Sequence, residues 1–176
     1  MNRLPEHAYH EFPAVFDGHS EILILGSFPS VKSREAGFYY GHPQNRFWKL
    51  LAALFESEEP VTQSEKTSFL LKHHIALWDV LAECEILGSS DASIKNAVPN
   101  DLSLILDHSK IRHIFLNGKT AYRYFLKYQA PFIRVPYGVL PSTSPANAAK
   151  SFENLKTDWS ILKDYIIGCP QKGQNS

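Results

Sequence analysis

The sequence predicts a single three-layer α/β/α domain built on a central, mainly parallel sheet of four strands. Two features indicate this fold: four short apolar runs are bounded by turn-forming residues, and amphipathic segments at helical spacing lie between them. Continuous apolar runs are typical of strands that are buried on both faces of a parallel sheet. The helical segments supply the crossovers that parallel strands require, and they would cover both faces of the sheet.

The expected elements follow one another along the chain. Strands are predicted at residues 21–25 (EILIL), 74–78 (HIALW), 112–116 (RHIFL) and 132–135 (FIRV). Helices are predicted at residues 45–57, 64–71, 101–106, 119–128 and 148–166, where apolar side chains recur at helical spacing. We find no repeat or linker, so residues 1–168 are expected to form one domain and residues 169–176 a polar, frayed tail. The N-terminal arm, with His7 and His10, is expected to be loose.

Composition narrows the functional classes. The 176 residues include 18 basic and 18 acidic side chains, which argues against tight binding along a long nucleic-acid track but permits a small basic patch. No apolar run approaches the roughly 20 residues of a membrane helix, and the N-terminus lacks the apolar core of a secretory signal. We therefore expect a cytoplasmic protein with no membrane partner.

Metal and cofactor chemistry is not expected. The chain has eight histidines but no HExxH, HxH or CxxC pattern, and two cysteines, Cys84 and Cys169, are too few for a disulfide framework or a four-cysteine cluster. Nucleotide-binding patterns (GxGxxG, GxxxxGK[ST]) and the GxSxG elbow of serine hydrolases are also missing from the sequence.

Candidate functional segments lie after the predicted strands, because ligands of α/β folds bind beyond the carboxyl ends of parallel strands. The segments are residues 26–30 (GSFPS), 79–94, 117–122 and 136–148, all rich in Gly, Ser, Pro or Asn. A dense run of rings and amides, residues 37–48 (GFYYGHPQNRFW), lies just beyond the first of them. We expect all five segments to line one crevice.

The chemistry of these segments remains open from residue types alone. Tyr40 offers a flat face for a planar ring, and Asn45 carries an amide whose oxygen could orient a water molecule. Arg46 at a helix start is a poor match to the helix dipole, which indicates a partner elsewhere. Asn147 could cap the last helix, or its loop could hold a phosphate. A turn and hydrophobic staple before a helix would explain residues 37–48 equally well.

The motifs taken together resemble the uracil-DNA glycosylase superfamily, and in particular its hypoxanthine-DNA glycosylase branch. They are LILGSFPS (23–30), GFYYGHPQNRFW (37–48), LWDVL (77–81), GSSDASI (88–94), FLNGKTA (115–121) and LPSTSPANA (140–148). The resemblance implies a monofunctional DNA repair enzyme without a cofactor, monomeric on double-stranded DNA. Such an enzyme flips a deaminated base, which for this branch is the hypoxanthine of deoxyinosine, and hydrolyses its N-glycosidic bond.

The same resemblance assigns roles to residues. Asn45 is the implied catalytic residue, since Phe28 occupies the position of the usual catalytic Asn or Asp, and Ser142 that of the usual histidine near the C-terminus. Ser27, Phe28, Tyr40, Trp78 and Asn117 are expected to bind the base. Contacts to the DNA backbone, or insertion into the duplex, are expected from Ser89, Ser90, Ser93, Ser142, Thr143, Ser144, Pro145 and Asn147. Asp79 and His42 are possible auxiliary residues.

Three alternatives stay open. A uracil- or mismatch-specific glycosylase is disfavoured by Phe28, which can neither orient water nor stabilise charge. A non-catalytic protein that binds damaged DNA is mildly disfavoured by Asn45 and by the balanced charge. A metabolic α/β enzyme acting on a free nucleobase or nucleoside is the third.

Overall fold

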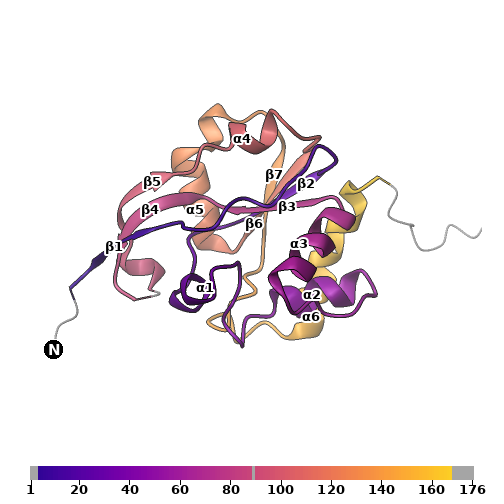
Figure 1. Cartoon of the computed structure of the whole chain (residues 1–176), viewed down its shortest axis with the longest axis horizontal. Coiled ribbons are helices and arrows are strands. Elements are labelled where there is room, and N and C mark those ends of the chain that lie inside the picture. The colour runs from indigo at the N-terminus through magenta and orange to yellow at the C-terminus, as the bar shows by residue number, and fades with distance from the viewer. Residues whose placement is uncertain (1–3, 89, 168–176) are drawn as a thin grey trace, which may run out of the picture.

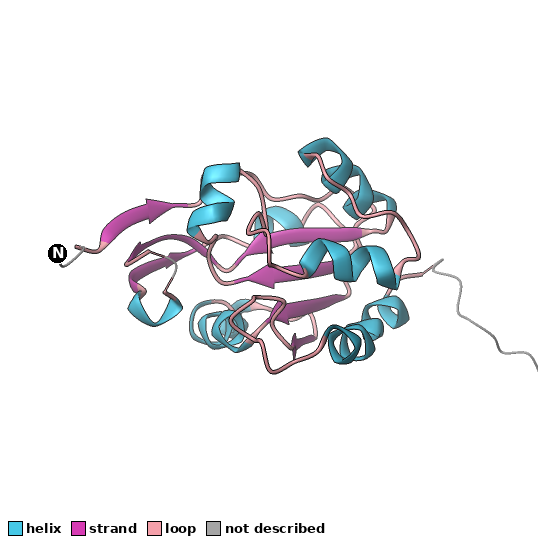
Figure 2. Ribbon diagram, turned by 90° about the horizontal axis from the view of Figure 1, so that it is seen from below, coloured by secondary structure: helices cyan, strands magenta, loops and turns pink. Residues whose placement is uncertain are grey.

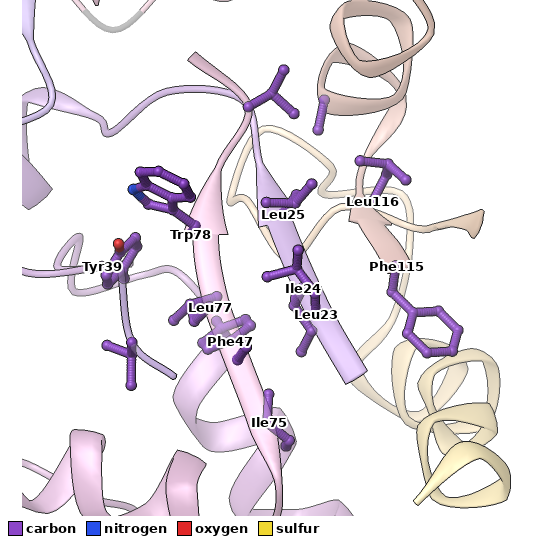
Figure 3. Close-up of a cluster of buried hydrophobic side chains, with 14 of the residues drawn as sticks. Leu23, Ile24, Leu25, Tyr39, Phe47, Ile75, Leu77, Trp78, Phe115 and Leu116 are labelled. Atoms are coloured by element: carbon purple, nitrogen blue, oxygen red, sulfur yellow. The ribbon is translucent and has the colours of Figure 1, made fainter. Parts of the chain in front are cut away.

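The computed structural model describes residues 4–88 and 90–167. Its centre is a parallel sheet in the order β3-β2-β6-β7, formed by β2 (Ile22–Gly26), β3 (Ile75–Asp79), β6 (His113–Asn117) and β7 (Tyr137–Leu140) (Figure 1). The residues of the two innermost strands, β2 and β6, and of β3 are buried throughout. Figure 3 shows their aliphatic side chains packed in one cluster with Phe47 and Tyr39. The α/β prediction is therefore confirmed.

Helices lie on both sides of the sheet, as Figure 2 shows. They are α1 (Val31–Ala36), α2 (Phe47–Leu54), α3 (Gln63–Lys72), α4 (Ser103–Leu106), α5 (Lys119–Tyr128) and α6 (Phe152–Trp159), with 3-10 turns η1 (Asp91–Ser93), η2 (Ala130–Phe132) and η3 (Ser160–Tyr165). Local signals explain several boundaries. Thr62 and Glu65 form a capping box at the start of α3, and Gly37 ends α1 in the left-handed conformation.

A second, antiparallel sheet was not predicted. It has the order β1-β4-β5 and consists of β1 (Glu6–Tyr9), β4 (Leu81–Ile86) and β5 (Lys95–Pro99). The expectation of a loose N-terminal arm is thus wrong, because β1 pairs with β4, and the backbone N–H of His10 donates to the Ala82 carbonyl at 2.7 Å. This pairing brings the N-terminal segment to the end of β3.

Two further boundaries differ from the prediction. The strand expected at residues 132–135 is instead β7 (Tyr137–Leu140), an edge strand with a half-exposed pattern that does not form a continuous apolar run. The helix expected at residues 148–166 begins at Phe152 and continues as the 3-10 turn η3. Its cap is Ser151, whose hydroxyl accepts from the Asn154 N–H, so the capping role considered for Asn147 is wrong.

Within residues 4–88 and 90–167, no helix is both long and apolar enough to cross a membrane. In the same part of the chain, no three His, Cys, Asp or Glu side chains gather where they could hold a metal ion. Cys84 is a buried free thiol, and Cys169, like the tail expected at residues 169–176, lies outside the described residues.

His113 makes stability depend on pH. Its ring packs on Phe115 and Tyr165, and burial lowers its pKa below the ordinary 6.5. Between the two pKa values the unfolded chain binds more protons, so the free energy of unfolding should fall as the pH drops below about 6.5. The replacement His113→Gln should reduce the difference in urea midpoint between pH 7.5 and pH 5.5. The exposed control His108→Gln should leave that difference unchanged, and an unaltered difference in His113→Gln would contradict this assignment.

Candidate active site

A cavity of about 360 Å³ opens at the carboxyl ends of the central strands. Its lining comes from all five segments that the sequence indicated. The lining residues are Gly26, Ser27, Phe28, Pro29, Ser30, Ser33, Tyr39, Tyr40, His42, Asn45, Asp79, Ile86, Asp91, Asn117, Gly118, Lys119, Thr120, Ser142, Thr143, Ser144, Pro145 and Ala146. The expected convergence of these segments is therefore present in the fold.

Asn45 lies in the wall of this cavity, immediately before α2. Its Oδ1 accepts two hydrogen bonds, from the backbone N–H of Phe47 at 3.0 Å and from the hydroxyl of Thr143 at 2.9 Å. The Phe47 N–H can only donate, so it identifies the atom facing it as the oxygen. Both lone pairs of that oxygen are occupied, which leaves the –NH2 group as the part of the amide that can serve a ligand.

Thr143 links three segments that are distant in the sequence. It is fully buried; its backbone N–H donates to Asn117 Oδ1, and the Asn117 –NH2 donates to its hydroxyl, both at 3.1 Å. Its carbonyl accepts from the Arg46 N–H at 3.1 Å. The expected contact between Thr143 and the DNA backbone is thus wrong for this structure, because no part of the side chain is exposed and its hydroxyl orients Asn45. Asn117 lines the cavity but is also committed to this network.

Arg46 fastens the Ser-rich loop, residues 142–147, and the segment that follows it to the start of α2. Its guanidinium donates to the Lys150 carbonyl at 2.5 Å and to the Asn147 carbonyl at 3.1 Å. The partner that its unfavourable helix position indicated is therefore within the chain.

Replacing Arg46 with lysine should lower the free energy of unfolding by about 1–3 kcal/mol, since a lysine cannot reproduce the two-pronged contact. Urea denaturation beside the exposed control Arg134→Lys would measure the change. Equal midpoints for the two variants would show that the guanidinium does not hold the loop.

Tyr40 combines a strained backbone with a buried hydroxyl. Its φ is +53°, in the left-handed region that non-glycine residues rarely adopt, and its ring stacks on Phe47 at 4.0 Å between centroids. Among the described residues its hydroxyl has no hydrogen-bond partner. Burial, followed by the nearby Asp79 charge, raises the pKa of this hydroxyl, so it remains protonated. One face of the ring is covered by Phe47, which limits the base-stacking role expected for Tyr40.

Asp79 forms a buried pair with His10 at the inner end of the cavity. Asp79 Oδ2 lies 2.8 Å from His10 Nε2, and the side chains are 6% and 3% exposed, respectively. A carboxylate can only accept, so the ring N–H donates. His10 is itself enclosed by the rings of Phe12, Tyr39 and Phe28. Sequence reasoning considered Asp79 but missed His10, because no local signal predicts that β1 pairs with β4.

The sequence and the fold both match known proteins. The profile of the uracil DNA glycosylase superfamily matches residues 13–164. The chain belongs to this superfamily. Two relatives, both named hypoxanthine DNA glycosylase, come from Methanosarcina acetivorans (38% identical over 156 residues, 86% of this chain and 95% of the relative) and Methanosarcina barkeri (33% over 154 residues, 85% and 94%).

A solved structure supports the same assignment. The solution NMR structure of a candidate uracil DNA glycosylase from Methanosarcina acetivorans superposes with a TM-score of 0.74 at 35% identity, covering 86% of this chain and 93% of that one. The resemblance inferred from the motifs is thereby confirmed at the level of family and fold.

In this superfamily member, the first loop contributes Ser27 and Phe28 to the cavity wall, as expected. Phe28 is 8% exposed, and the Arg34 guanidinium lies 5.8 Å from its ring centre. The Ser27 hydroxyl lies 3.4 Å from Asp91 Oδ1. Burial raises the pKa of Asp91, against the opposing effect of this hydroxyl. Asp91 is a second lining carboxylate that sequence reasoning did not single out.

Trp78 does not take the position expected for it. It is buried in the hydrophobic core and is not among the described residues that line the cavity (Figure 3). Because side chains alternate along a strand, the arrangement that brings Asp79 to the cavity turns its neighbour away. The prediction that Trp78 binds a base is therefore wrong for this structure.

Some of the remaining loop residues are exposed, and others have their side chains hydrogen-bonded within the protein. Ser90 is exposed, whereas the Ser93 hydroxyl donates to the Ser90 carbonyl and accepts from the Leu87 N–H. Ser89 lies outside the described residues. His42 lines the cavity, and its Nδ1 accepts from the Gln44 N–H.

The Ser-rich loop holds its own shape through short-range hydrogen bonds. The hydroxyls of Ser142 and Ser144 accept from the N–H groups of Ser144 and Ala146, and the Asn147 amide donates to the Ser142 carbonyl. Ser142, Ser144 and Pro145 line the cavity, while Asn147 supports the loop from behind. The first turn of α5 completes this wall with Lys119 and Thr120. The Lys119 ammonium gives the cavity wall a positive charge, which residue types alone could not locate.

Proposed function

We propose that this protein removes hypoxanthine from deoxyinosine in double-stranded DNA by hydrolysing the N-glycosidic bond, which leaves an abasic site. The observation that carries the proposal is the Asn45 amide, fixed in a cavity wall at the ends of the central strands. Relatives named hypoxanthine DNA glycosylase, which match most of the chain, support the choice of base.

The cavity accounts for how a base could be reached. A base stacked in a duplex is inaccessible to an enzyme, so the nucleotide must be extruded into a pocket at a cost of a few kcal/mol. A cavity of about 360 Å³ has the size of a small-molecule site. We assign the lining residues Ser142, Ser144 and Pro145, together with the exposed Ser90, to contacts with the DNA backbone, with Lys119 as an added phosphate partner. Ser89 and Ser93 stay expectations of the sequence alone.

Asn45 is proposed to position the attacking water. Bond cleavage develops an oxocarbenium-like sugar to which water adds, and an amide cannot act as a general base near neutrality. The sequence suggested that the amide oxygen would orient this water; with that oxygen occupied by Phe47 and Thr143, the –NH2 group is the better candidate. It would donate to the water oxygen and hold it beside the sugar carbon. The backbone N–H groups of Ser27 and Phe28 are proposed to stabilise charge on the departing base.

One assay tests this proposal against its alternatives. Duplexes with a single deoxyinosine, deoxyxanthosine or deoxyuridine would be incubated with the protein and then cleaved with alkali at abasic sites. We expect strand scission to be fastest for deoxyinosine. Preferential cleavage at deoxyuridine would instead indicate a uracil glycosylase, and binding without scission a recognition protein. Competition by free inosine, with none by undamaged duplex, would indicate a metabolic enzyme.

We further propose that the protein acts as a monomer in the cytoplasm, needs no cofactor or metal, and that residues 1–168 form one domain. A monomer is consistent with a cavity whose walls all come from one chain. Size-exclusion chromatography with light scattering, with and without duplex, tests the oligomeric state.

A further inference from the structure

The inner end of the cavity presents a donor and an acceptor that converge on one point. Gly26, the last residue of β2, marks it: a Cβ atom added there would lie 2.4 Å from Asp79 Oδ1 and 3.0 Å from the Tyr40 hydroxyl. All three residues line the cavity. The two polar atoms therefore flank the same small region of the wall, and any side chain at position 26 would displace one of them.

The acceptor is Asp79 Oδ1. The other carboxylate oxygen, Oδ2, takes the His10 N–H at 2.8 Å, which fixes the rotation of the carboxylate and leaves Oδ1 directed toward Gly26 and Tyr40. His10 is held in turn by its backbone hydrogen bond to Ala82 and by the surrounding rings. Oδ1 is thereby left as an acceptor in the cavity wall, so a ligand that supplies an N–H there would gain a hydrogen bond.

The donor is the Tyr40 hydroxyl. It is buried, without a hydrogen-bond partner among the described residues, and protonated at any pH the protein meets. The Asn117 –NH2 group donates one N–H to Thr143, and its other N–H faces the Tyr40 oxygen, where it lowers the pKa of the hydroxyl against the effect of burial. A donor on that oxygen leaves the hydroxyl proton of Tyr40 free for an acceptor. The left-handed backbone at Tyr40 and the stacking of its ring on Phe47 hold the hydroxyl in place. Strain retained at a cavity wall is itself an indication of function.

We propose that Asp79 and Tyr40 form an edge reader that recognises the N–H and C=O groups side by side on a deaminated base, and that His10 is its positioning residue. The inference rests on the proposed function and names its specificity determinant. In hypoxanthine, N1–H would donate to Asp79 Oδ1 while O6 accepts from the Tyr40 hydroxyl. Tyr40 would then meet the base through its hydroxyl, not through its ring face.

The edge reader would select bases by the order of hydrogen-bond donor and acceptor on their edge. Adenine carries an acceptor at N1, which would face the Asp79 acceptor, and an amine at position 6, which offers no acceptor for the Tyr40 hydroxyl proton. Xanthine and uracil share the N–H/C=O edge and should be accepted at this point. Guanine shares it as well; its rejection would depend on its 2-amino group and on the greater cost of extruding a correctly paired base.

The test compares excision of deoxyinosine with that of 1-methyldeoxyinosine, which lacks the N1–H, and of deoxyadenosine, under single-turnover conditions. We expect the wild-type protein to favour deoxyinosine over 1-methyldeoxyinosine by about 100-fold or more. In Asp79→Asn the His10 N–H would retain the amide oxygen, so –NH2 would replace Oδ1 and reverse the polarity. In that variant the excision rate of deoxyinosine should exceed that of 1-methyldeoxyinosine by much less than in the wild type. The ratio of the deoxyinosine rate to the deoxyadenosine rate should also fall.

Two further variants separate recognition from structure. Tyr40→Phe removes only the hydroxyl and should lower deoxyinosine excision about 10- to 100-fold. His10→Gln can still donate to Asp79 and should keep the base preference, whereas His10→Phe should lose it. Asp164→Asn and Tyr128→Phe, both outside the cavity lining, are the matched controls, and thermal unfolding checks that each variant is folded.

The outcomes are distinguishable from failure of the proposed function. Folded Asp79→Asn and Tyr40→Phe proteins with wild-type base preferences would overturn the edge reader even if deoxyinosine is excised. If the wild-type protein excises nothing, the proposed function fails, and binding of free bases tests the reader instead. Fluorescence titration should then show hypoxanthine binding about tenfold or more tighter than 1-methylhypoxanthine in the wild type alone, and equal affinities would reject the reader.

Discussion

Replacing Asn45 with alanine should slow base excision about 100-fold or more, while the affinity for deoxyinosine duplex stays within a few-fold of wild type. The loss is expected in the chemical step because Asn45 touches the cavity through one amide and contributes no charge to DNA binding. Single-turnover kinetics and equilibrium binding, measured on the same duplex, would separate the two effects. Asn154→Ala, on the exposed side of α6, is the matched control.

Asn45→Asp distinguishes the two ways in which the amide could act. A carboxylate at position 45 can still accept from the Phe47 N–H and the Thr143 hydroxyl, but it offers the cavity an acceptor in place of the –NH2 donor. If donation by –NH2 positions the water, Asn45→Asp should be about as slow as Asn45→Ala. Turnover near wild type in Asn45→Asp would show that an oxygen at position 45, not the –NH2 group, positions the water. Near-normal turnover in Asn45→Ala would show that Asn45 takes no part in the mechanism.

Gly26→Ala should have an effect of similar size for a steric reason. The new Cβ would lie 2.4 Å from Asp79 Oδ1, closer than real Cβ atoms approach a neighbour, and 3.0 Å from the Tyr40 hydroxyl, which is also a tight contact. Neither neighbour can move freely, because Asp79 is bound to His10 and the Tyr40 ring is stacked on Phe47. We expect excision to fall about 100-fold or more, since displacement of about 1 Å at a reacting site costs that much.

Gly138→Ala on β7 is the control for this substitution. A Cβ at Gly138 would meet its nearest neighbour, His113 Nε2, at 3.7 Å, an ordinary contact distance. Thermal unfolding should show both alanine variants folded, with excision lost only in Gly26→Ala. Wild-type excision by a folded Gly26→Ala protein would show that the inner wall of the cavity does not participate.

The fold was predictable where local patterns determine it. The three most buried strands of the parallel sheet were found because they are continuous apolar runs. The edge strand β7 was misplaced because only its last residue is buried, and strand β1 was missed because a single residue, Ala8, faces the core. Its pairing with β4 joins residues about 76 positions apart, such as His7 and Glu83, and no local pattern contains that information.

The site was predictable in its segments but not in its hydrogen bonds. The rule that parallel strands end at one edge correctly grouped Asn45 with Ser27, Asn117 and the Ser-rich loop. The hydrogen bond that determines which end of the Asn45 amide faces the cavity comes from Thr143, 98 residues away. Thr143 was expected to face DNA because the family resemblance assigns its loop to the DNA backbone, and its complete burial is a tertiary effect.

The most direct test of the account is the identity of what the protein releases from a deoxyinosine duplex. Mass spectrometry of one reaction should detect free hypoxanthine and, in equal amount, a strand lighter by the lost base and retaining an abasic sugar. Wild-type protein and the Asn154→Ala control should give both products, and Asn45→Ala should give neither within the same time. An intact strand with wild-type protein, or release of hypoxanthine by Asn45→Ala at the wild-type rate, would contradict the account.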